Sequence, residues 1–249
     1  GLAQFDDPEF GETLAKMYRR FQPKDRPGLL EIIVSRPSFA SALLDRLDAD
    51  REPIPSTDLT AFHARQVLGF GDDTLNEKLA KRWGVLRDSP SDRLALIDAT
   101  KSKLTEAVLA EADLSAGRAL FKKTCSQCHM LFGEGEKVGP DLTGAQRSSL
   151  DYLLQNMLDP SAVVGKDYHM SIVLLDDGRV LNGLVVSKND KVLVIQTQSA
   201  RETIPVDSID RIKETSLSPM PDGLLTTLSE KQVRDLVGYL MSPLQVELK

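Results

Sequence analysis

The chain has 249 residues, of which 41% are hydrophobic and 27% are charged, and its formal net charge at pH 7 is −6. This composition is typical of a soluble globular protein, and the length suffices for one large domain or two to three small ones. The acidic balance argues against nucleic-acid binding, and no apolar run reaches the roughly 20 residues of a membrane span. The sequence begins at Gly1 without a signal peptide, so we expect a processed product or a piece of a longer protein.

Residues 1–112 are predicted to form a series of short helices. Apolar residues recur at helical spacing, and Pro27, Asp58 and Ser91 lie where helices are expected to begin. Short helices in antiparallel pairs suggest a HEAT-like α-solenoid, but without a clean sequence period an irregular bundle fits as well. His63 lies here, and a lone histidine on a helix is usually a surface or core residue. We interpret 1–112 as a helical scaffold domain.

The five residues Cys125-Ser126-Gln127-Cys128-His129 form the pattern C-x-x-C-H, the attachment signature of a c-type haem. A helix beginning near Asp113 or Ser115 is expected to lead into it. Two thiols one helical turn apart can add to the two vinyl groups along one edge of a porphyrin. The imidazole of His129 can then bind the iron as its proximal ligand. We therefore predict one covalently attached haem c.

Two other uses of a C-x-x-C pattern fit the sequence less well. Structural zinc needs four ligands, and this chain has no cysteines besides Cys125 and Cys128. Its histidines are His63, His129 and His169. A thioredoxin-like dithiol would follow a βαβ pattern, which is absent before the motif. The cysteines are therefore assigned to haem, and no disulfide is expected.

A loop punctuated by glycine and proline, residues 133–144, follows the motif. A metal-bound histidine usually donates its other ring N–H to an acceptor that fixes the ring. The carbonyl of Pro140 is the candidate acceptor for His129; the alternative is that the loop is a plain connector. A further helix is expected to begin at Ser148 and to end at Asp159-Pro160.

The hydrophobic period changes from helical to alternating at about residue 166. Five strands are predicted between residues 166 and 215, with a hairpin turn at Asp176-Asp177-Gly178. They are expected to form a small antiparallel meander that packs on a neighbour, because so small a sheet is not comfortably stable alone. The stretch 166–215 separates His129 from the C-terminal part of the chain. His129 and Met220 are 91 positions apart, which is long for a small cytochrome, so this stretch is predicted to be an insertion in an otherwise compact haem domain.

Met220 lies between two prolines in an extended segment before the last helix. Such a stiff segment can hold a thioether over a haem face, although a methionine can also simply fill a gap in the core. Met220 is the predicted sixth ligand, because methionine with histidine is the ligand pair of cytochromes c. His169 and Met170, at the entrance of the first strand, are its main competitors.

The last helix is expected to begin at Ser229, which forms a capping-box pattern with Gln232. If this helix crosses the one that leads into C-x-x-C-H, Tyr239 would pack near Gly117. A glycine there would let the two backbones approach.

These residues resemble the c-type haem-binding domain family of planctomycete and verrucomicrobial proteins. The shared motifs are G-R-A-L-F before the cysteines, V-G-P-D-L-T-G after them, the D-D-G-R hairpin, M-P-x-G-L and D-L-V-G-Y-L. The likeness covers about residues 113–243. It implies a class I-like cytochrome c domain with an inserted sheet, in which Cys125 and Cys128 anchor the haem and His129 and Met220 are axial ligands. Family members are commonly the C-terminal part of larger exported proteins, some with a dehydrogenase-like β-propeller upstream.

The predicted fold is therefore mainly α with a small antiparallel β insertion: a helical domain over 1–112 and a mono-haem cytochrome c domain over 113–249. We expect an electron carrier rather than an enzyme, served by a redox partner protein or an upstream dehydrogenase domain. One alternative is a haem-based ligand sensor or peroxidase with a displaceable sixth ligand. Another is a docking module whose haem only ties the domain together. The resemblance implies a periplasmic or otherwise extracytoplasmic location, where c-type haem is attached.

Overall fold

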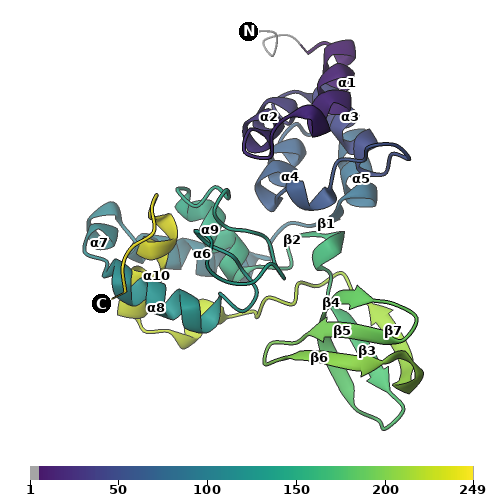
Figure 1. Cartoon of the computed structure of the whole chain (residues 1–249). Helices are drawn as coiled ribbons and strands as arrows, with labels where there is room; N and C mark the ends of the chain where they lie inside the picture. The colour runs from purple at the N-terminus through teal and green to yellow at the C-terminus, as the bar shows by residue number, and fades with distance from the viewer. Residues whose placement is uncertain (1–5, 249) are drawn as a thin grey trace. The chain divides into compact units, whose positions relative to one another are not determined.

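The structure is a computed structural model that describes residues 6–248. The chain divides into two compact units (Figure 1). The first unit comprises the described part of Gly1–Leu86 together with Val163–Asp167, and the second comprises Arg87–Ala162 with the described part of Tyr168–Lys249. The division after Leu86 lies earlier than the boundary at residue 112 that the sequence predicted.

The first unit is built from short helices, as the sequence predicted. They are α1 (Pro8–Met17), η2 (Tyr18–Arg20), α2 (Arg26–Ile33), α3 (Pro37–Leu47), η3 (Ser56–Asp58), α4 (Ala61–Leu68) and α5 (Asp73–Arg82). Helix α1 packs on α3, and α3 packs on α5. A Cβ added at Gly11 of α1 would lie 2.7 Å from the ring of Phe39, so this glycine lets α1 approach α3 closely. A HEAT-like repeat in this unit remains a prediction.

A two-stranded ribbon completes the first unit. Strand β1 (Gly84–Leu86) pairs antiparallel with β2 (Val163–Gly165). The chain therefore leaves this unit after Leu86 and returns to it at Val163, after the C-x-x-C-H motif. A Cβ at Gly84 would lie 2.1 Å from the carbonyl oxygen of Val164, which requires glycine there. The sequence did not predict this ribbon, because three-residue strands carry no detectable alternation.

The second unit has a helical part with its own apolar core. Its helices are α6 (Ser91–Lys103), α7 (Glu106–Ala110), α8 (Leu114–Thr124), α9 (Leu150–Leu158), η6 (Leu224–Thr227) and α10 (Glu230–Met241). Helices α8 and α10 pack closely, and α6 packs on α9. Ile97 of α6 and Leu104 are buried in the same cluster as Phe121 of α8. This shared burial is why α6 and α7 belong with the haem region and not with the residues before them.

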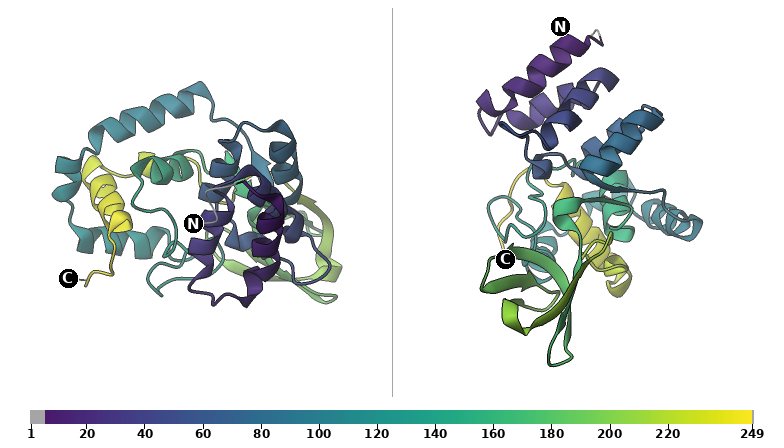
Figure 2. Two further views of the ribbon diagram at one scale, coloured as in Figure 1. Left: turned by 90° about the horizontal axis from the view of Figure 1, so that it is seen from above. Right: turned by 90° about the vertical axis from the view of Figure 1, so that its right-hand side faces the viewer.

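The predicted insertion is a five-stranded antiparallel sheet of order β6-β5-β4-β3-β7 (Figures 1 and 2). Its elements are η4 (Lys166–Tyr168), β3 (Ser171–Leu175), β4 (Val180–Lys188), β5 (Val192–Gln196), β6 (Arg201–Pro205), η5 (Val206–Ser208) and β7 (Ile209–Glu214). Five strands were predicted, but the last does not continue the meander: β7 crosses to pair with β3. A separate core, including Val173, Leu193 and Ile195, holds the sheet together.

The position of β7 places the entry and exit of the insertion side by side. The backbone N–H of Met170 donates to the carbonyl of Leu217 at 2.8 Å, and the N–H of Thr215 donates to the carbonyl of Met170 at 2.8 Å. The chain therefore re-enters the helical part where it left, and Met220 follows directly. Across residues 6–248, the helices are all too short or too polar to span a membrane.

Candidate haem site

The C-x-x-C-H motif sits at the end of α8. The carboxylate of Asp113 caps the start of that helix, and Cys125 closes it with an N–H donated to the carbonyl of Phe121 at 2.8 Å. The backbone then makes one more turn, because the N–H groups of Cys128 and His129 both donate to the carbonyl of Cys125, at 3.0 and 2.8 Å. This turn brings two free, half-buried thiols and one imidazole together.

The ring of His129 is held by Pro140. Its Nδ1 lies 2.8 Å from the carbonyl oxygen of Pro140, the acceptor named from the sequence. A carbonyl oxygen can only accept, so Nδ1 carries the proton and Nε2 keeps its lone pair. Burial lowers the pKa of His129, although the bond to Pro140 acts in the opposite direction. The neutral imidazole thus leaves Nε2 unprotonated, with its lone pair free to bind a metal.

The loop that carries Pro140 is fixed to the motif by its backbone. The N–H groups of Val138 and Gly139 both donate to the carbonyl of Cys128, at 3.1 and 2.7 Å. A Cβ at Gly139 would lie 2.8 Å from Cε1 of His129, so the ring rests against this glycine. Gly135 has a φ of +104°, and a Cβ there would lie 2.2 Å from the carbonyl oxygen of His129.

A buried arginine ties the far end of this loop to α10. The side chain of Arg147 is 7% exposed, and it donates to the carbonyls of Leu142 at 2.7 Å and Ser242 at 2.8 Å. It also donates to the carbonyl of Leu240, and its guanidinium carbon lies 4.7 Å from the ring centroid of Phe132. Burial lowers the pKa of Arg147. Sequence reasoning missed this residue, because its acceptors at the C-terminal end of α10, Leu240 and Ser242, lie 93 and 95 residues away along the chain.

Burial keeps both thiols protonated in the folded chain. It raises the pKa of Cys125 to about 12, and the neighbouring Cys128 acts in the same direction. Burial also raises the pKa of Cys128, although the positive charge of Arg201 on β6 offsets part of this effect. In the folded chain at neutral pH the pair therefore consists of neutral thiols.

Met220 lies in the same unit and packs against the apolar cluster that also contacts Cys125 and Leu142. Its backbone N–H donates to the hydroxyl oxygen of Ser218 at 3.1 Å, and the N–H of Ser218 donates to the hydroxyl oxygen of Ser161 at 3.1 Å. The segment around Met220 is thus fastened beside α9. The side chain is half-buried, as is that of His129.

The two other histidines have different surroundings. His63 accepts the N–H of Thr60 at 3.2 Å and so caps α4, which is a structural role. Nδ1 of His169 lies 3.3 Å from the carboxylate of Glu214, and its buried Nε2 has no hydrogen-bond partner within residues 6–248. His169 therefore belongs to the base of the sheet, where Met170 also lies.

The donor set fits a covalently bound haem. Two neutral thiols stand one turn apart, and the adjacent imidazole has one nitrogen held by Pro140 and the other available. Within residues 6–248, no three His, Cys, Asp or Glu side chains are grouped closely enough to hold a metal ion.

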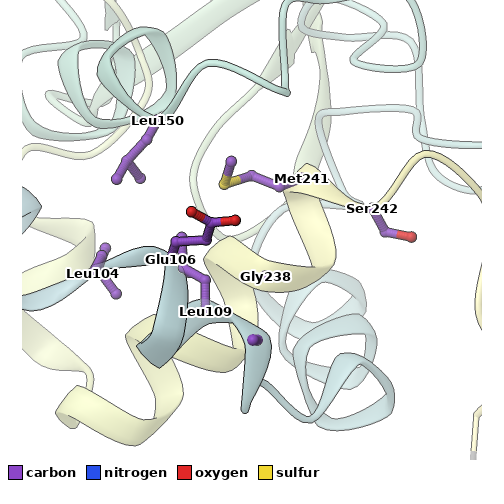
Figure 3. A pocket seen from close by; sticks show the side chains of 8 residues that line it. Leu104, Glu106, Leu109, Leu150, Gly238, Met241 and Ser242 are labelled. Atoms are coloured by element: carbon purple, nitrogen blue, oxygen red, sulfur yellow. The ribbon is translucent and has the colours of Figure 1, made fainter.

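An apolar pocket of about 440 Å³ lies elsewhere in the second unit (Figure 3). It is lined mainly by leucines and Met241, with Glu106 of α7 as its acidic side chain. None of the predicted haem residues lines it.

The sequence of the haem region is similar to known proteins. Residues 114–168 match the family described as Cytochrome c. The cytochromes c of Theileria parva and Theileria annulata are each 32% identical to this chain over 82 residues. The matched stretch covers 31% of this chain and 71% of each relative.

Proposed function

This chain belongs to the cytochrome c family, and we propose that it is a mono-haem c-type cytochrome that acts in electron transfer. Family membership supports a haem-dependent redox role, and the number of haems follows from the single C-x-x-C-H in 249 residues. The observation that carries the proposal is the hydrogen bond from His129 to Pro140, because it leaves the residue after the second cysteine poised as an iron ligand.

Each candidate residue has a specific role in this proposal. Cys125 and Cys128 attach the haem through thioether bonds, and Nε2 of His129 is the proximal ligand. The carbonyl oxygen of Pro140 accepts a hydrogen bond from Nδ1–H of His129. This bond fixes the ring and makes Nε2 a better electron donor to the iron. Met220 is the sixth ligand. The bound haem supplies an iron that exchanges single electrons.

Two protein ligands suit electron transfer because neither has to leave when the iron changes oxidation state. The apolar cluster around Phe121, Leu154 and Leu236 excludes water from the interior of the unit. Met220 and Cys125 both pack on that cluster, which supports their placement at one haem pocket. The chain's own residues therefore hold, orient and shield the group without any acid–base chemistry.

The wider setting is also part of the proposal. The resemblance to the planctomycete and verrucomicrobial domain family supports a place in a larger exported protein, at or next to a dehydrogenase that supplies electrons. The location is accordingly periplasmic or otherwise extracytoplasmic. A redox partner protein would accept the electrons.

The test is a haem-loaded preparation titrated with redox mediators and then exposed to carbon monoxide in its ferrous state. An electron carrier should show one reversible one-electron step and should not bind carbon monoxide. Ready carbon monoxide binding by the wild-type protein would instead support a ligand sensor or peroxidase, and a haem that no mediator can reduce would support a purely structural role.

A further inference from the structure

The inserted sheet touches the haem-attachment motif through the turn between β5 and β6, residues 197–200. The side-chain amide of Gln127, which lies between the two cysteines, donates to the carbonyl oxygen of Gln198 at 3.1 Å. Arg201, the first residue of β6, lies 3.7 Å from the carboxylate of Glu136 in the following loop. Residues 71 positions apart in the sequence are thus brought together at the motif.

Both contacts lie beside the haem-attachment residues, because Gln127 directly precedes Cys128 and the backbone N–H of Glu136 donates to the carbonyl of Ser126 at 2.8 Å. The β5–β6 turn therefore borders the segment from Cys125 to Cys128. Because the two thiols bond to one edge of the porphyrin, this segment marks that edge of the haem.

The contact between the β5–β6 turn and the motif is weak enough to open. Gln127, Gln198, Arg201 and Glu136 are all exposed, and an ion pair whose side chains are 46% and 61% exposed contributes little to stability. The sheet has its own buried core, and the helical part has another. Losing the contact would therefore unfold neither part.

We propose that the β5–β6 turn is a movable cover over the haem edge to which Cys125 and Cys128 attach, and that its opening controls how readily a redox partner reaches that edge. The inference rests on the proposed function, because it requires a haem at these thiols. The rate of electron transfer falls steeply with distance between donor and acceptor. When the turn covers the attachment edge, the distance between the haem and a redox partner is longer. When the turn opens, that distance is shorter. The electron passes from the ferrous iron to an external one-electron oxidant, and no bond is made or broken.

The test uses charge reversal at Arg201 in the haem-loaded protein. Arg201→Glu places a carboxylate beside Glu136, so repulsion should hold the cover open. Arg179→Glu is the matched control: it makes the same change of charge on the same sheet, at an exposed residue paired with Asp177. The double variant Glu136→Lys/Arg201→Glu rebuilds the ion pair with its charges exchanged.

Two readouts are compared. Hydrogen-exchange mass spectrometry follows residues 126–139 and 197–201, and stopped-flow absorbance follows oxidation of the ferrous protein by ferricyanide. We expect Arg201→Glu to exchange hydrogen several-fold faster in these segments and to be oxidised several-fold faster than Arg179→Glu. The double variant should return both rates close to the wild-type values.

Equal behaviour of Arg201→Glu and Arg179→Glu in both readouts would overturn the proposal. So would faster hydrogen exchange without faster oxidation, because the turn would then move without controlling access. A chain that takes up no covalent haem would contradict the proposed function instead. That outcome is recognised from the absorption spectrum before either variant is compared.

Discussion

Gly117 of α8 lies directly against Tyr239 of α10. A Cβ added at Gly117 would lie 2.7 Å from the Cβ of Tyr239 and 2.0 Å from the carbonyl oxygen of Asp235. The ring of Tyr239 also packs on Phe121, with 5.8 Å between ring centroids, four residues before Cys125. The crossing of α8 and α10 at Gly117 was predicted from the sequence and is confirmed in the structure. It fixes the direction of α8 and therefore the position of the C-x-x-C-H motif at its end.

Gly117→Ala should therefore destabilise the second unit. The added methyl group meets a backbone carbonyl, which cannot move without moving α10, so the two helices must separate. Overpacking of this kind lowers the free energy of unfolding by about 1–3 kcal/mol. Thermal unfolding of the variant should show a lower midpoint. Gly28→Ala in α2, where no atom lies within 4 Å of the added Cβ, is the control and should be neutral or slightly stabilising. Equal midpoints for Gly117→Ala and wild type would show that the helices do not meet here.

Gly139→Ala should disturb His129, the proposed axial ligand, without unfolding the chain. The added methyl group would lie 2.8 Å from Cε1 of His129, so the ring must turn and its bond to Pro140 must lengthen. The expected result is a changed ferric absorption spectrum and a changed reduction potential. Gly144→Ala, in the same loop but with open space around the Cβ, should leave both unchanged. If the two variants give the same spectrum, the ring does not rest on Gly139.

Protonation of His63 should destabilise the first unit in acid. Burial lowers its pKa to about 4, from 6.5 in the unfolded chain, so the folded state resists protonation. Between pH 6.5 and 4 the unfolded chain binds the extra proton, and the stability should therefore fall as the pH drops through this range and level off below it. The loss amounts to about 3 kcal/mol.

His63→Gln provides the control for this pH dependence. Glutamine at the third helical position can still complete a capping box with Thr60, but it does not titrate. Denaturant unfolding at several pH values should show the loss between pH 6.5 and 4 in the wild type and not in the variant. A loss that persists in His63→Gln would assign the effect to another group.

Arg147→Met should loosen the link between the haem loop and α10. It leaves the buried carbonyls of Leu142, Leu240 and Ser242 without their donor, and a buried unsatisfied carbonyl costs about 1–3 kcal/mol. The melting temperature should fall clearly. Arg179→Met, at an exposed arginine, should change it little. Similar melting temperatures for the two variants would rule out the structural role of Arg147.

Local patterns predicted most of what the haem region contains. The C-x-x-C-H motif, the loop with Pro140 and the alternating strands each have a short-range signal, and the structure places His129 against Pro140. One long helix from Ser91 was predicted where the structure has α6 and α7, and it was placed before residue 112, because nothing near Ile97 in the sequence shows that it packs with Phe121. Burial of this kind depends on contacts between distant segments.

The same reason explains the other features that the sequence did not predict. The pairing of β7 with β3 depends on a choice of neighbour that hydrophobic alternation does not encode. The role of Arg147 depends on carbonyls that only the packed α10 brings within reach. The contact of Gln127 with the β5–β6 turn likewise needs the sheet to be folded and placed.

The most direct test of the central claim is the absorption spectrum of the oxidised protein beside that of Met220→Ala. By resemblance to class I cytochromes, ligation of the iron by the thioether of Met220 opposite His129 should give a weak far-red charge-transfer band. We predict that the wild-type protein shows this band and that Met220→Ala lacks it while keeping its covalent haem. A band that is absent from the wild type, or that survives the substitution, would contradict the assignment of Met220 as the sixth ligand.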